Sequence, residues 1–309
     1  MSSNRERAIV VSALKHAAPY IRLFKRKVFV LKVGGEVFAD NARTKALMEQ
    51  VGILHQVGIR VVMVHGGGPQ STELAAQLGV DTTFVEGRRV TDGASLDIAT
   101  MVLNGQINTR VLAACRDLGI PAVGISGVDA GLIRAHKRPP VDRANDEPVD
   151  YGFVGDIDSV EADIVSKQLD NGLMPVISPL SCDESGTLLN INADTVAAAI
   201  AAELDAEKLI LITAAPGILE DAADPRSLIS FLDRADLENL KAAGKLADGM
   251  LPKAAAVDAA LENGVSRVHI ISWKVPDSLL LEVFTNEGTG TLVVNDTALL
   301  TAAEQAGTA

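Results

Sequence analysis

Apolar residues recur every three to four positions between Arg5 and Phe24, the spacing of an amphipathic helix. Pro19 lies inside this stretch. Because proline lacks a backbone N–H and its ring crowds the preceding turn, we expect a kink or a break there. The stretch leads without a linker into an apolar run, which favours a docking or oligomer-forming helix over an organelle-targeting peptide.

Short apolar runs then alternate with helical patterns along the rest of the chain. The predicted buried strands are Val28–Val33, Arg60–His65, Ala122–Ile125, Pro175–Ser178, Lys208–Thr213 and Val268–Ser272. Alternation of strands and helices is typical of a sheet covered by helices on both faces. We therefore predict an α/β protein: a three-layer αβα sandwich around an open, mainly parallel sheet.

Three segments are expected along the chain: an oligomerisation helix (1–25), a first lobe (26–204) and a second, smaller lobe (205–309). A predicted helix at Thr195–Leu204 closes the first lobe. Within that lobe, the paired prolines and mixed charges of Arg134–Tyr151 break the alternation, so a surface loop or hairpin is expected.

The formal net charge of −12 argues against a general surface for nucleic acids or acidic membranes, because phosphate groups would be repelled. No run of eighteen apolar residues is present to span a bilayer, and the N-terminal stretch lacks the apolar region of a secretory signal. We expect a cytoplasmic protein in which a few focused groups bind any phosphate.

One predicted strand runs into His65–Pro69, which reads HGGGP and precedes a helical pattern. Consecutive glycines expose backbone N–H groups, and a proline in the first turn aims the helix N-terminus at the same place. The string predicts an oxyanion site. A similar string forms the oxyanion hole of some esterases, but those enzymes need a G-x-S-x-G turn, and Gly124–Val128 has its second glycine in the wrong place. We set the hydrolase aside.

Two lysines stand where a bare cation is unfavourable. Lys32 interrupts an apolar strand just before Gly34 and Gly35, and a buried ammonium group needs a carboxylate or a phosphate. Lys253 follows Pro252 in the first turn of a predicted helix, where the helix dipole disfavours a cation. Both lysines are candidates for a bound anion, with a snorkelling or solvated lysine as the alternative.

Two further strings carry polar groups that a ligand would use. Asn190–Asp194 precedes an apolar helix, and Asp194 taken alone is best explained as a helix N-cap. The string Gly87–Thr91 offers the Arg89 guanidinium, which can bind a carboxylate through two parallel hydrogen bonds, although a surface ion pair is the alternative.

Together these strings resemble the amino acid kinase superfamily and, within it, the N-acetyl-L-glutamate kinases. The likeness runs from about Pro19 to Val294 and rests on many motifs in the same order. They are Lys32–Gly35, His65–Pro69, Gly87–Thr91, Ser126–Asp129, Tyr151–Gly155, Asn190–Asp194, Pro216–Leu219 and Gly288–Thr291.

The resemblance implies transfer of the γ-phosphoryl group of ATP, with Mg²⁺ held mainly by the nucleotide phosphates, onto the side-chain carboxylate of N-acetyl-L-glutamate. It places the acceptor in the first lobe and ATP in the second. The implied catalytic residues are Lys32, Asp194 and Lys253; the implied phosphate-binding residues are Gly34, Gly35, Gly66 and Gly67; and the implied acceptor-binding residues are Gly67, Arg89 and Asn190. Phosphoryl transfer asks mainly for alignment and charge stabilisation, which such a set supplies.

The N-terminal helix resembles that of arginine-inhibited members, in which such helices interlace dimers into a hexameric ring. The resemblance therefore implies a homo-oligomer, dimeric or hexameric, and an L-arginine site at Tyr20, His269, Glu282 and Gly288.

Two departures bear on this expectation: Ala214 stands where the family carries an aspartate, and Ser272–Lys274 stands where it reads Asp-Gly-Arg. A sister kinase with another carboxylate acceptor and a catalytically silent regulatory ring are the alternatives.

Overall fold

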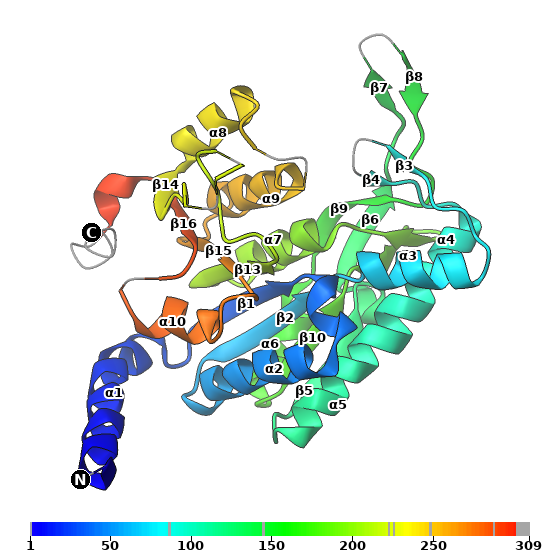
Figure 1. Cartoon of the computed structure of the whole chain (residues 1–309). Coiled ribbons are helices and arrows are strands. Elements are labelled where there is room, and N and C mark those ends of the chain that lie inside the picture. Colours follow the sequence, from blue (N-terminus) through cyan, green and yellow to red (C-terminus); the bar gives the residue numbers. More distant parts are fainter. Residues whose placement is uncertain are drawn as a thin grey trace.

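A computed structural model describes residues 2–85, 88–143, 146–221, 223–224, 226–246, 249–286 and 288–300 (Figure 1). Gly87, which belongs to the predicted carboxylate-binding string, lies outside the described residues. The centre of the molecule is a sheet of eight strands in the order β14-β16-β15-β13-β1-β2-β10-β5. All neighbouring strands in it run parallel except β15 and β16.

The main sheet takes half of its strands from residues 26–204 and half from residues 205–309. The first half comprises β1 (Val28–Val33), β2 (Arg60–His65), β5 (Ala122–Ser126) and β10 (Met174–Ser178). The second comprises β13 (Lys208–Thr213), β14 (Phe231–Asp233), β15 (Val268–Ser272) and β16 (Thr291–Val294). The six strands predicted from apolar runs are confirmed, four of them with the predicted bounds.

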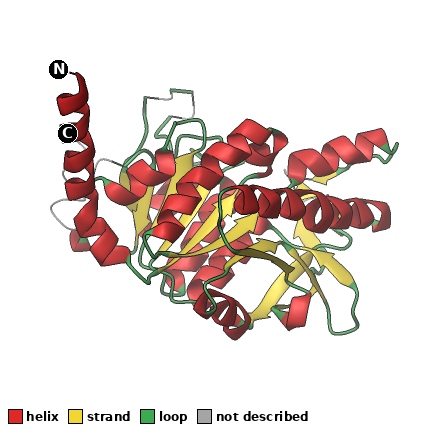
Figure 2. Cartoon of the chain, turned by 90° about the horizontal axis from the view of Figure 1, so that it is seen from below, coloured by secondary structure: helices red, strands yellow, loops and turns green. Residues whose placement is uncertain are grey.

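Helices cover both faces of this sheet, which confirms the predicted three layers (Figure 2). One face packs against α6 (Ala162–Asp170), α7 (Ala193–Glu203) and α9 (Leu251–Glu262). The other packs against α2 (Asn41–Gln56), α5 (Thr109–Asp117) and α10 (Ser278–Phe284). The remaining α-helices are α1 (Ser2–Phe24), α3 (Gly68–Gln77), α4 (Gly93–Thr100) and α8 (Arg234–Ala242).

Strand alternation decides which face each chemical group reaches. In β1, Phe29 and Leu31 lie in the core that contains α2 and α10, whereas Val30 lies in the core that contains α7 and α9. Lys32 has the parity of Val30, so its side chain points to the α7 and α9 face. His65 and His269 have the opposite parity in their strands, which directs both to the α2 and α10 face.

A smaller sheet flanks the main one in the order β12-β11-β6-β9. Its strands are β6 (Ile133–Lys137), β9 (Gly155–Val160), β11 (Leu180–Cys182) and β12 (Leu188–Asn190). Two short hairpins, β3 (Phe84–Val85) with β4 (Arg88–Arg89) and β7 (Val141–Arg143) with β8 (Asp146–Val149), extend from this side (Figure 1). The hairpin expected in Arg134–Tyr151 is confirmed, and its first residues also form β6.

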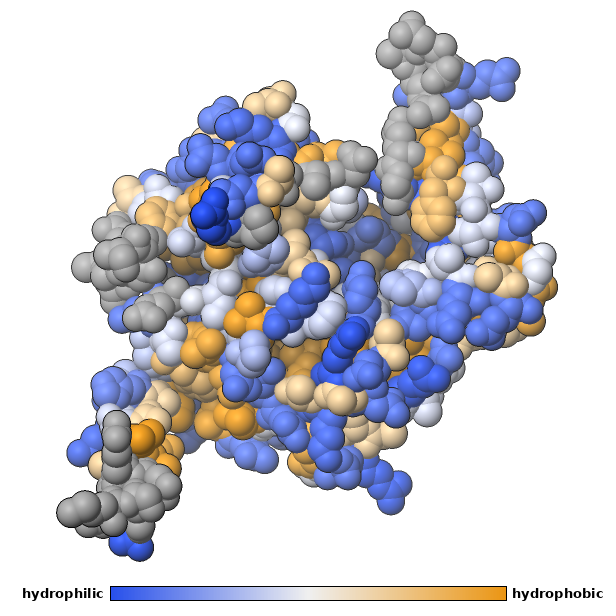
Figure 3. All heavy atoms as spheres, viewed as in Figure 1, coloured by the Kyte–Doolittle hydropathy of each residue, from blue (hydrophilic) through white to orange (hydrophobic). Residues whose placement is uncertain are grey.

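Helix α1 (Ser2–Phe24) continues through Pro19, so the break expected there is wrong. Ile9, Val10 and Leu14 on this helix are each about 60% exposed. In Figure 3, α1 projects from the lower left of the molecule and carries apolar surface. Among the described residues, no helix is both long enough and apolar enough to cross a membrane.

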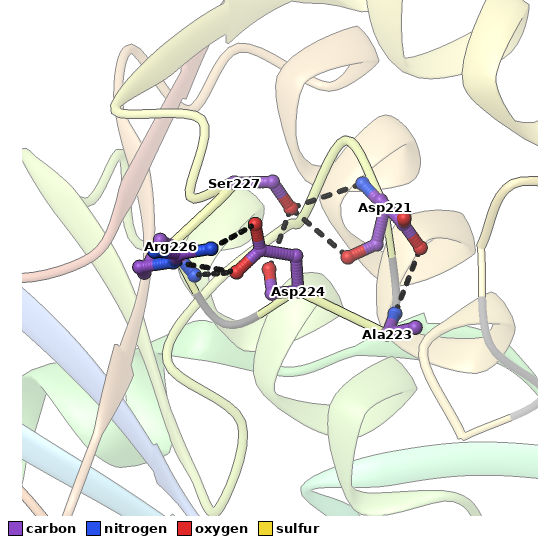
Figure 4. A network of polar contacts seen from close by, with 5 residues as sticks. All are labelled: Asp221, Ala223, Asp224, Arg226 and Ser227. Atoms are coloured by element: carbon purple, nitrogen blue, oxygen red, sulfur yellow. Dashed lines mark hydrogen bonds and ion pairs between the residues drawn. The ribbon is translucent and has the colours of Figure 1, made fainter.

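The loop between β13 and β14 is ordered by its own polar groups (Figure 4). The Ser227 hydroxyl donates to the carbonyl oxygens of Asp221 and Asp224, at 2.9 and 2.7 Å. Upstream, Gly217 leaves no room for a side chain, since a Cβ there would lie 2.5 Å from Thr291 Oγ1. This contact brings the Pro216–Leu219 and Gly288–Thr291 strings together, although they lie far apart in the sequence.

Candidate active site

Lys32, Asp194 and Lys253 meet at the end of the sheet where the parallel strands finish. Lys32 Nζ lies 2.9 Å from Asp194 Oδ1, and Lys253 Nζ donates to Asp194 Oδ2 at 3.3 Å. The side chains of Lys32 and Asp194 are 9% and 5% exposed. Lys32 comes from β1, Asp194 from the first turn of α7 and Lys253 from the first turn of α9. Two ammonium groups thus share one buried carboxylate.

The cap of α7 is Asn192 rather than Asp194. The Asn192 side chain accepts hydrogen bonds from the N–H groups of Asp194 and Thr195, at 2.8 and 3.3 Å. This occupies the usual capping role. The interpretation of Asp194 as a simple cap is therefore wrong, and its carboxylate is free to pair with the lysines.

Asp194 stays ionised despite its burial. Burial by itself raises the pKa of this carboxyl, but the ammonium groups of Lys32 and Lys253 more than offset that effect and hold the pKa below its usual value. An efficient general base has a pKa near the working pH, so a carboxylate whose pKa is lowered is a poor proton acceptor at neutral pH. It can orient two cations. The three groups carry a net charge of +1, which suits a phosphoryl group.

The glycine loops after β1 and β2 lie side by side at this edge. The Gly34 N–H donates to the Ile212 carbonyl at 3.0 Å, and the Gly66 N–H donates to the Val33 carbonyl at 2.9 Å. In this structure these two N–H groups extend the hydrogen bonding of the sheet. The Gly67 N–H has no partner among the described residues, and Gly35 begins a 3-10 helix, η1 (Gly35–Ala39), whose first N–H groups have none inside the helix.

Close packing explains why both loops are glycine-rich. A Cβ at Gly35 would lie 3.0 Å from Gly67 Cα, and a Cβ at Gly67 would lie 2.7 Å from side-chain atoms of Leu103 and Ile107. The two loops approach each other's backbone directly. Any side chain there would separate the Gly35 and Gly67 N–H groups.

Arg89 reaches from β4 to the start of α3. Its guanidinium donates to Thr72 Oγ1 at 2.6 Å and to the Gly68 carbonyl at 3.3 Å, and it lies 4.9 Å from the ring centroid of Phe84. Partial burial lowers the pKa of this guanidinium. In the part of the chain that the structure describes, Arg89 forms no ion pair. The surface-pair alternative is therefore not supported, and the cation is available to a carboxylate.

Asn190 is connected to the segment that carries Arg89 by a contact with Thr91. Its side-chain amide donates to Thr91 Oγ1 at 3.4 Å. Thr91 also exchanges backbone hydrogen bonds with Tyr151 and Phe153, at 2.9 and 2.7 Å. Gly152, with φ +74, makes this approach feasible, because a Cβ there would lie 2.2 Å from the Thr91 carbonyl oxygen. The bridge ties the Arg89 hairpin to the second sheet.

Tyr20, His269, Glu282 and Gly288 gather on the opposite face, where α1, β15 and α10 meet. Lys208 Nζ lies 2.8 Å from His269 Nε2, and His269 Nδ1 lies 2.6 Å from Glu282 Oε1. A Cβ at Gly288 would lie 3.2 Å from the Glu282 carboxylate, and the Tyr20 hydroxyl donates to Asn286 in the adjoining loop. His269, Glu282 and Gly288 thus lie together, and Tyr20 contacts the loop that precedes Gly288.

Electrostatics in this second cluster favour a neutral imidazole between opposite charges. Burial and the Lys208 ammonium lower the pKa of His269. Burial would raise the pKa of Glu282, but the hydrogen bonds from His269 and the Thr289 N–H, together with the charge of Lys208, help to keep it below its ordinary value. With His269 neutral, Lys208 donates to Nε2 and Nδ1–H donates to Glu282.

Sequence analysis missed three buried polar residues near these sites. Lys208 begins the apolar strand β13 instead of interrupting it, so it lacked the signal that identified Lys32. Asn108 and Gln70 lie in helices with no such signal. The Gln70 amide nitrogen donates to the Gly35 carbonyl at 2.6 Å, while its Oε1 has no hydrogen-bond partner in the described structure.

Of the departure at Ser272–Lys274, Trp273 and Lys274 line a separate surface pocket of about 420 Å³. The Trp273 ring lies 4.8 Å from the Arg43 guanidinium carbon and 5.8 Å from Lys274 Nζ. The Trp273 backbone N–H donates to the Thr213 carbonyl at 3.0 Å, whereas its buried indole Nε1 has no hydrogen-bond partner among the described residues. The indole therefore packs between α2 and the start of α10, and the Trp273 backbone extends from the end of the β13 strand.

Residues 27–272 match the sequence pattern of the Amino acid kinase family. The chain belongs to the amino acid kinase family. Among curated members, this amino acid kinase is 47% identical to the acetylglutamate kinase of Myxococcus xanthus over 93% of this chain and 95% of that protein. It is 45% identical to the acetylglutamate kinase of Symbiobacterium thermophilum over 92% of this chain and 97% of that protein.

Solved structures agree with the amino acid kinase fold. The N-acetylglutamate synthase of Neisseria gonorrhoeae, complexed with coenzyme A and N-acetyl-glutamate, superposes with a TM-score of 0.81 at 29% identity. The superposition covers 93% of this chain and 64% of the synthase, so this amino acid kinase spans about two-thirds of that protein. The same synthase was also solved with coenzyme A and L-arginine.

Proposed function

We propose that this protein transfers the γ-phosphoryl group of ATP to the side-chain carboxylate of N-acetyl-L-glutamate, giving an acyl phosphate. The observation that carries the proposal is the pair of ammonium groups on Asp194, at 2.9 and 3.3 Å, beside two glycine loops whose Gly35 and Gly67 N–H groups have no partner among the described residues. Relatives named acetylglutamate kinase, aligned over nearly the whole chain, support the choice of acceptor. The reaction is a step of arginine biosynthesis.

The division of roles follows from charge. The attacking carboxylate is already ionised at pH 7, since its reference pKa is about 4.3, so no general base is needed. Lys32 and Lys253 offset the negative charge on the transferred phosphoryl group, and Asp194 holds the two ammonium groups in register. The N–H groups of Gly35 and Gly67 donate to its oxygens. The nucleotide brings Mg²⁺ on its own phosphates.

Acceptor binding falls to Arg89 and Asn190 in this proposal. The Arg89 guanidinium has no carboxylate partner in the described structure, and it lies against the start of α3 next to the Gly67 loop. A dicarboxylic acceptor presents one carboxylate to the phosphoryl group and leaves the other for such a cation. The lobe of residues 26–204 then holds the acceptor, and that of residues 205–309 holds ATP.

A second proposed property is inhibition by L-arginine at Tyr20, His269, Glu282 and Gly288. The buried Glu282 carboxylate is the natural partner for a guanidinium, and a synthase of related fold was solved with L-arginine. The exposed apolar side chains of α1 next to this cluster support a homo-oligomer, dimeric or hexameric, built through that helix.

The decisive experiment is ATP-dependent acyl-phosphate formation, trapped with hydroxylamine, across N-acetyl-L-glutamate, glutamate, aspartate and N-acetyl-aminoadipate. Turnover with N-acetyl-L-glutamate alone is the expected result. Turnover with another acid would keep the phosphoryl chemistry and identify a sister kinase. No turnover, with folded protein and Mg²⁺ present, would favour the silent regulatory ring.

A further inference from the structure

In the peptide group between Gly66 and Gly67, the carbonyl contacts a side chain and the N–H has no partner among the described residues. His65 Nδ1 lies 3.3 Å from the Gly66 carbonyl oxygen, and the N–H of the same peptide group, on Gly67, has no partner among the described residues. In a planar trans peptide the C=O and N–H point in opposite directions. Whatever orients the Gly66 carbonyl therefore also aims the Gly67 N–H.

That free N–H lies close to the loop that follows Lys32. A Cβ built at Gly35 would lie 3.2 Å from the Gly67 nitrogen. The position is next to the proposed phosphoryl site, where a donor that is already oriented stabilises developing charge.

The orientation of the carbonyl depends on which ring nitrogen of His65 carries the proton. Asn108 Nδ2 lies 3.3 Å from His65 Nε2. Because an amide nitrogen is only a donor, Nε2 must be the acceptor, and the proton must be on Nδ1. Nδ1–H then donates to the Gly66 carbonyl. With the proton on Nε2 instead, a lone pair would face that oxygen.

Asn108 is itself fixed in this orientation. Its Nδ2 also donates to the Val176 carbonyl of β10, at 3.0 Å, so both amide hydrogens are used. Asn108 ends an eight-residue π-helix, η2 (Met101–Asn108), a rare geometry that is frequent at functional sites. Gly124 makes space for it, since a Cβ there would lie 2.0 Å from Asn108 Oδ1.

We infer that His65 and Asn108 are positioning residues for phosphoryl transfer: Asn108 fixes the tautomer of His65, and His65 aims the Gly67 N–H at the phosphoryl group. The inference rests on the proposed function. His65 is fully buried and touches the Phe38 ring edge-on, at 6.2 Å between centroids, so it is not a group that contacts substrate. Burial, rather than any neighbouring charge, lowers the pKa of His65 to about 4, and the ring stays neutral at working pH.

The tautomer can be tested on the unaltered protein without any activity. We would label histidine with ¹⁵N and record the imidazole nitrogen shifts at pH 7, assigning His65 among the five histidines by its loss in His65→Asn. A protonated Nδ1 with an unprotonated Nε2 is expected. A protonated Nε2, or an imidazolium, overturns the inference whether or not the protein phosphorylates N-acetyl-L-glutamate.

A pair of substitutions tests the positioning role itself. Asn carries an amide nitrogen as many bonds from the backbone as Nδ1, whereas Leu fills similar space without a donor. We expect His65→Leu to lower kcat about 10²-fold, as for loss of one oxyanion donor, with KM for ATP nearly unchanged. His65→Asn should recover most of that loss. Equal losses in two folded variants, or a normal kcat in His65→Leu, would refute the positioning role.

A third variant separates positioning from folding. Asn108→Leu leaves His65 in place but removes the donor to Nε2. The labelled ring should then show the two neutral tautomers in exchange, with the proton on Nδ1 in one and on Nε2 in the other, and kcat should fall about ten-fold. An Asn108→Leu protein that keeps a pure Nδ1–H ring and a normal kcat would contradict the inference. If the unaltered protein phosphorylates none of the four acids, the proposed function fails, and the tautomer result stands separately.

Discussion

Asp194 Oδ1 lies 2.9 Å from Lys32 Nζ, and both side chains are more than nine-tenths buried. A buried ion pair gives little net stability, but removal of one partner strands a charge at a cost of about 3–5 kcal/mol. Loss of the Asp194 carboxylate would therefore leave the Lys32 ammonium buried without its partner. We expect Asp194→Asn to lower the free energy of unfolding by about 3 kcal/mol and kcat by at least about 10²-fold. Urea melts and hydroxylamine trapping measure the two.

Asn192→Ala is the matched control for that substitution, because it removes the cap of α7 and leaves the charges in place. A stability loss of about 1 kcal/mol is expected, with a much smaller fall in kcat. If the two variants lose kcat equally, the carboxylate of Asp194 has no special role.

Lys253→Ala should lower kcat by about 10²-fold or more, since it removes one of two cations facing the phosphoryl group. Lys241→Ala serves as control, because Lys241 is half-exposed and, among the described residues, pairs with Glu238 on its own helix. Steady-state rates with saturating ATP and acceptor check the prediction. A near-normal rate in Lys253→Ala would remove this lysine from the site.

Arg89→Ala should raise KM for the acceptor by about 10- to 100-fold, the range for loss of a hydrogen bond to a charged group, and change kcat less. The neighbouring Arg88 is exposed, and Arg88→Ala should leave KM unchanged. Acceptor titrations at saturating ATP measure both variants. An unchanged KM in Arg89→Ala would assign the acceptor pocket elsewhere.

His65 should make stability depend on pH between about 6.5 and 4. Burial lowers the pKa of His65 from 6.5 to about 4 in the folded protein, so in this window the unfolded chain binds a proton that the folded chain does not. Acidification then favours unfolding. The contribution is complete above pH 6.5, and about 3 kcal/mol is lost by pH 4.

Unfolding free energies of the wild type and His65→Asn, measured by urea melts across that window, test this expectation. The variant should show a flatter dependence, because its other titrating groups are unchanged. Parallel curves would mean that His65 does not titrate as its burial implies.

L-arginine should inhibit the wild type, and Glu282→Gln should raise the half-inhibitory concentration by at least about ten-fold, the usual loss when one ion-pair partner is neutralised. Citrulline, which lacks the positive charge, should not inhibit. Initial rates against each amino acid give the comparison. Activity that is unchanged at saturating arginine would end the proposal of feedback inhibition.

The sequence by itself determined the strands and the main chemical groups. Apolar runs such as Val28–Val33 can be satisfied only in a buried strand, so their bounds followed from hydrophobicity alone. Lys32 and Lys253 were identifiable because a cation in an apolar strand or at a helix N-terminus is costly without a partner.

Tertiary structure alone decided which hydrogen bonds those groups make. The Gly34 N–H donates to the carbonyl of Ile212, a residue far along the chain, and no local sequence pattern predicts that hydrogen bond. In the same way, only the packed fold shows that Asn192 caps α7, and that Asn108 at the end of η2 meets His65 at the end of β2. Local periodicity fixes which face a side chain takes, whereas the partner of a buried polar group depends on the strands and helices that fold against it.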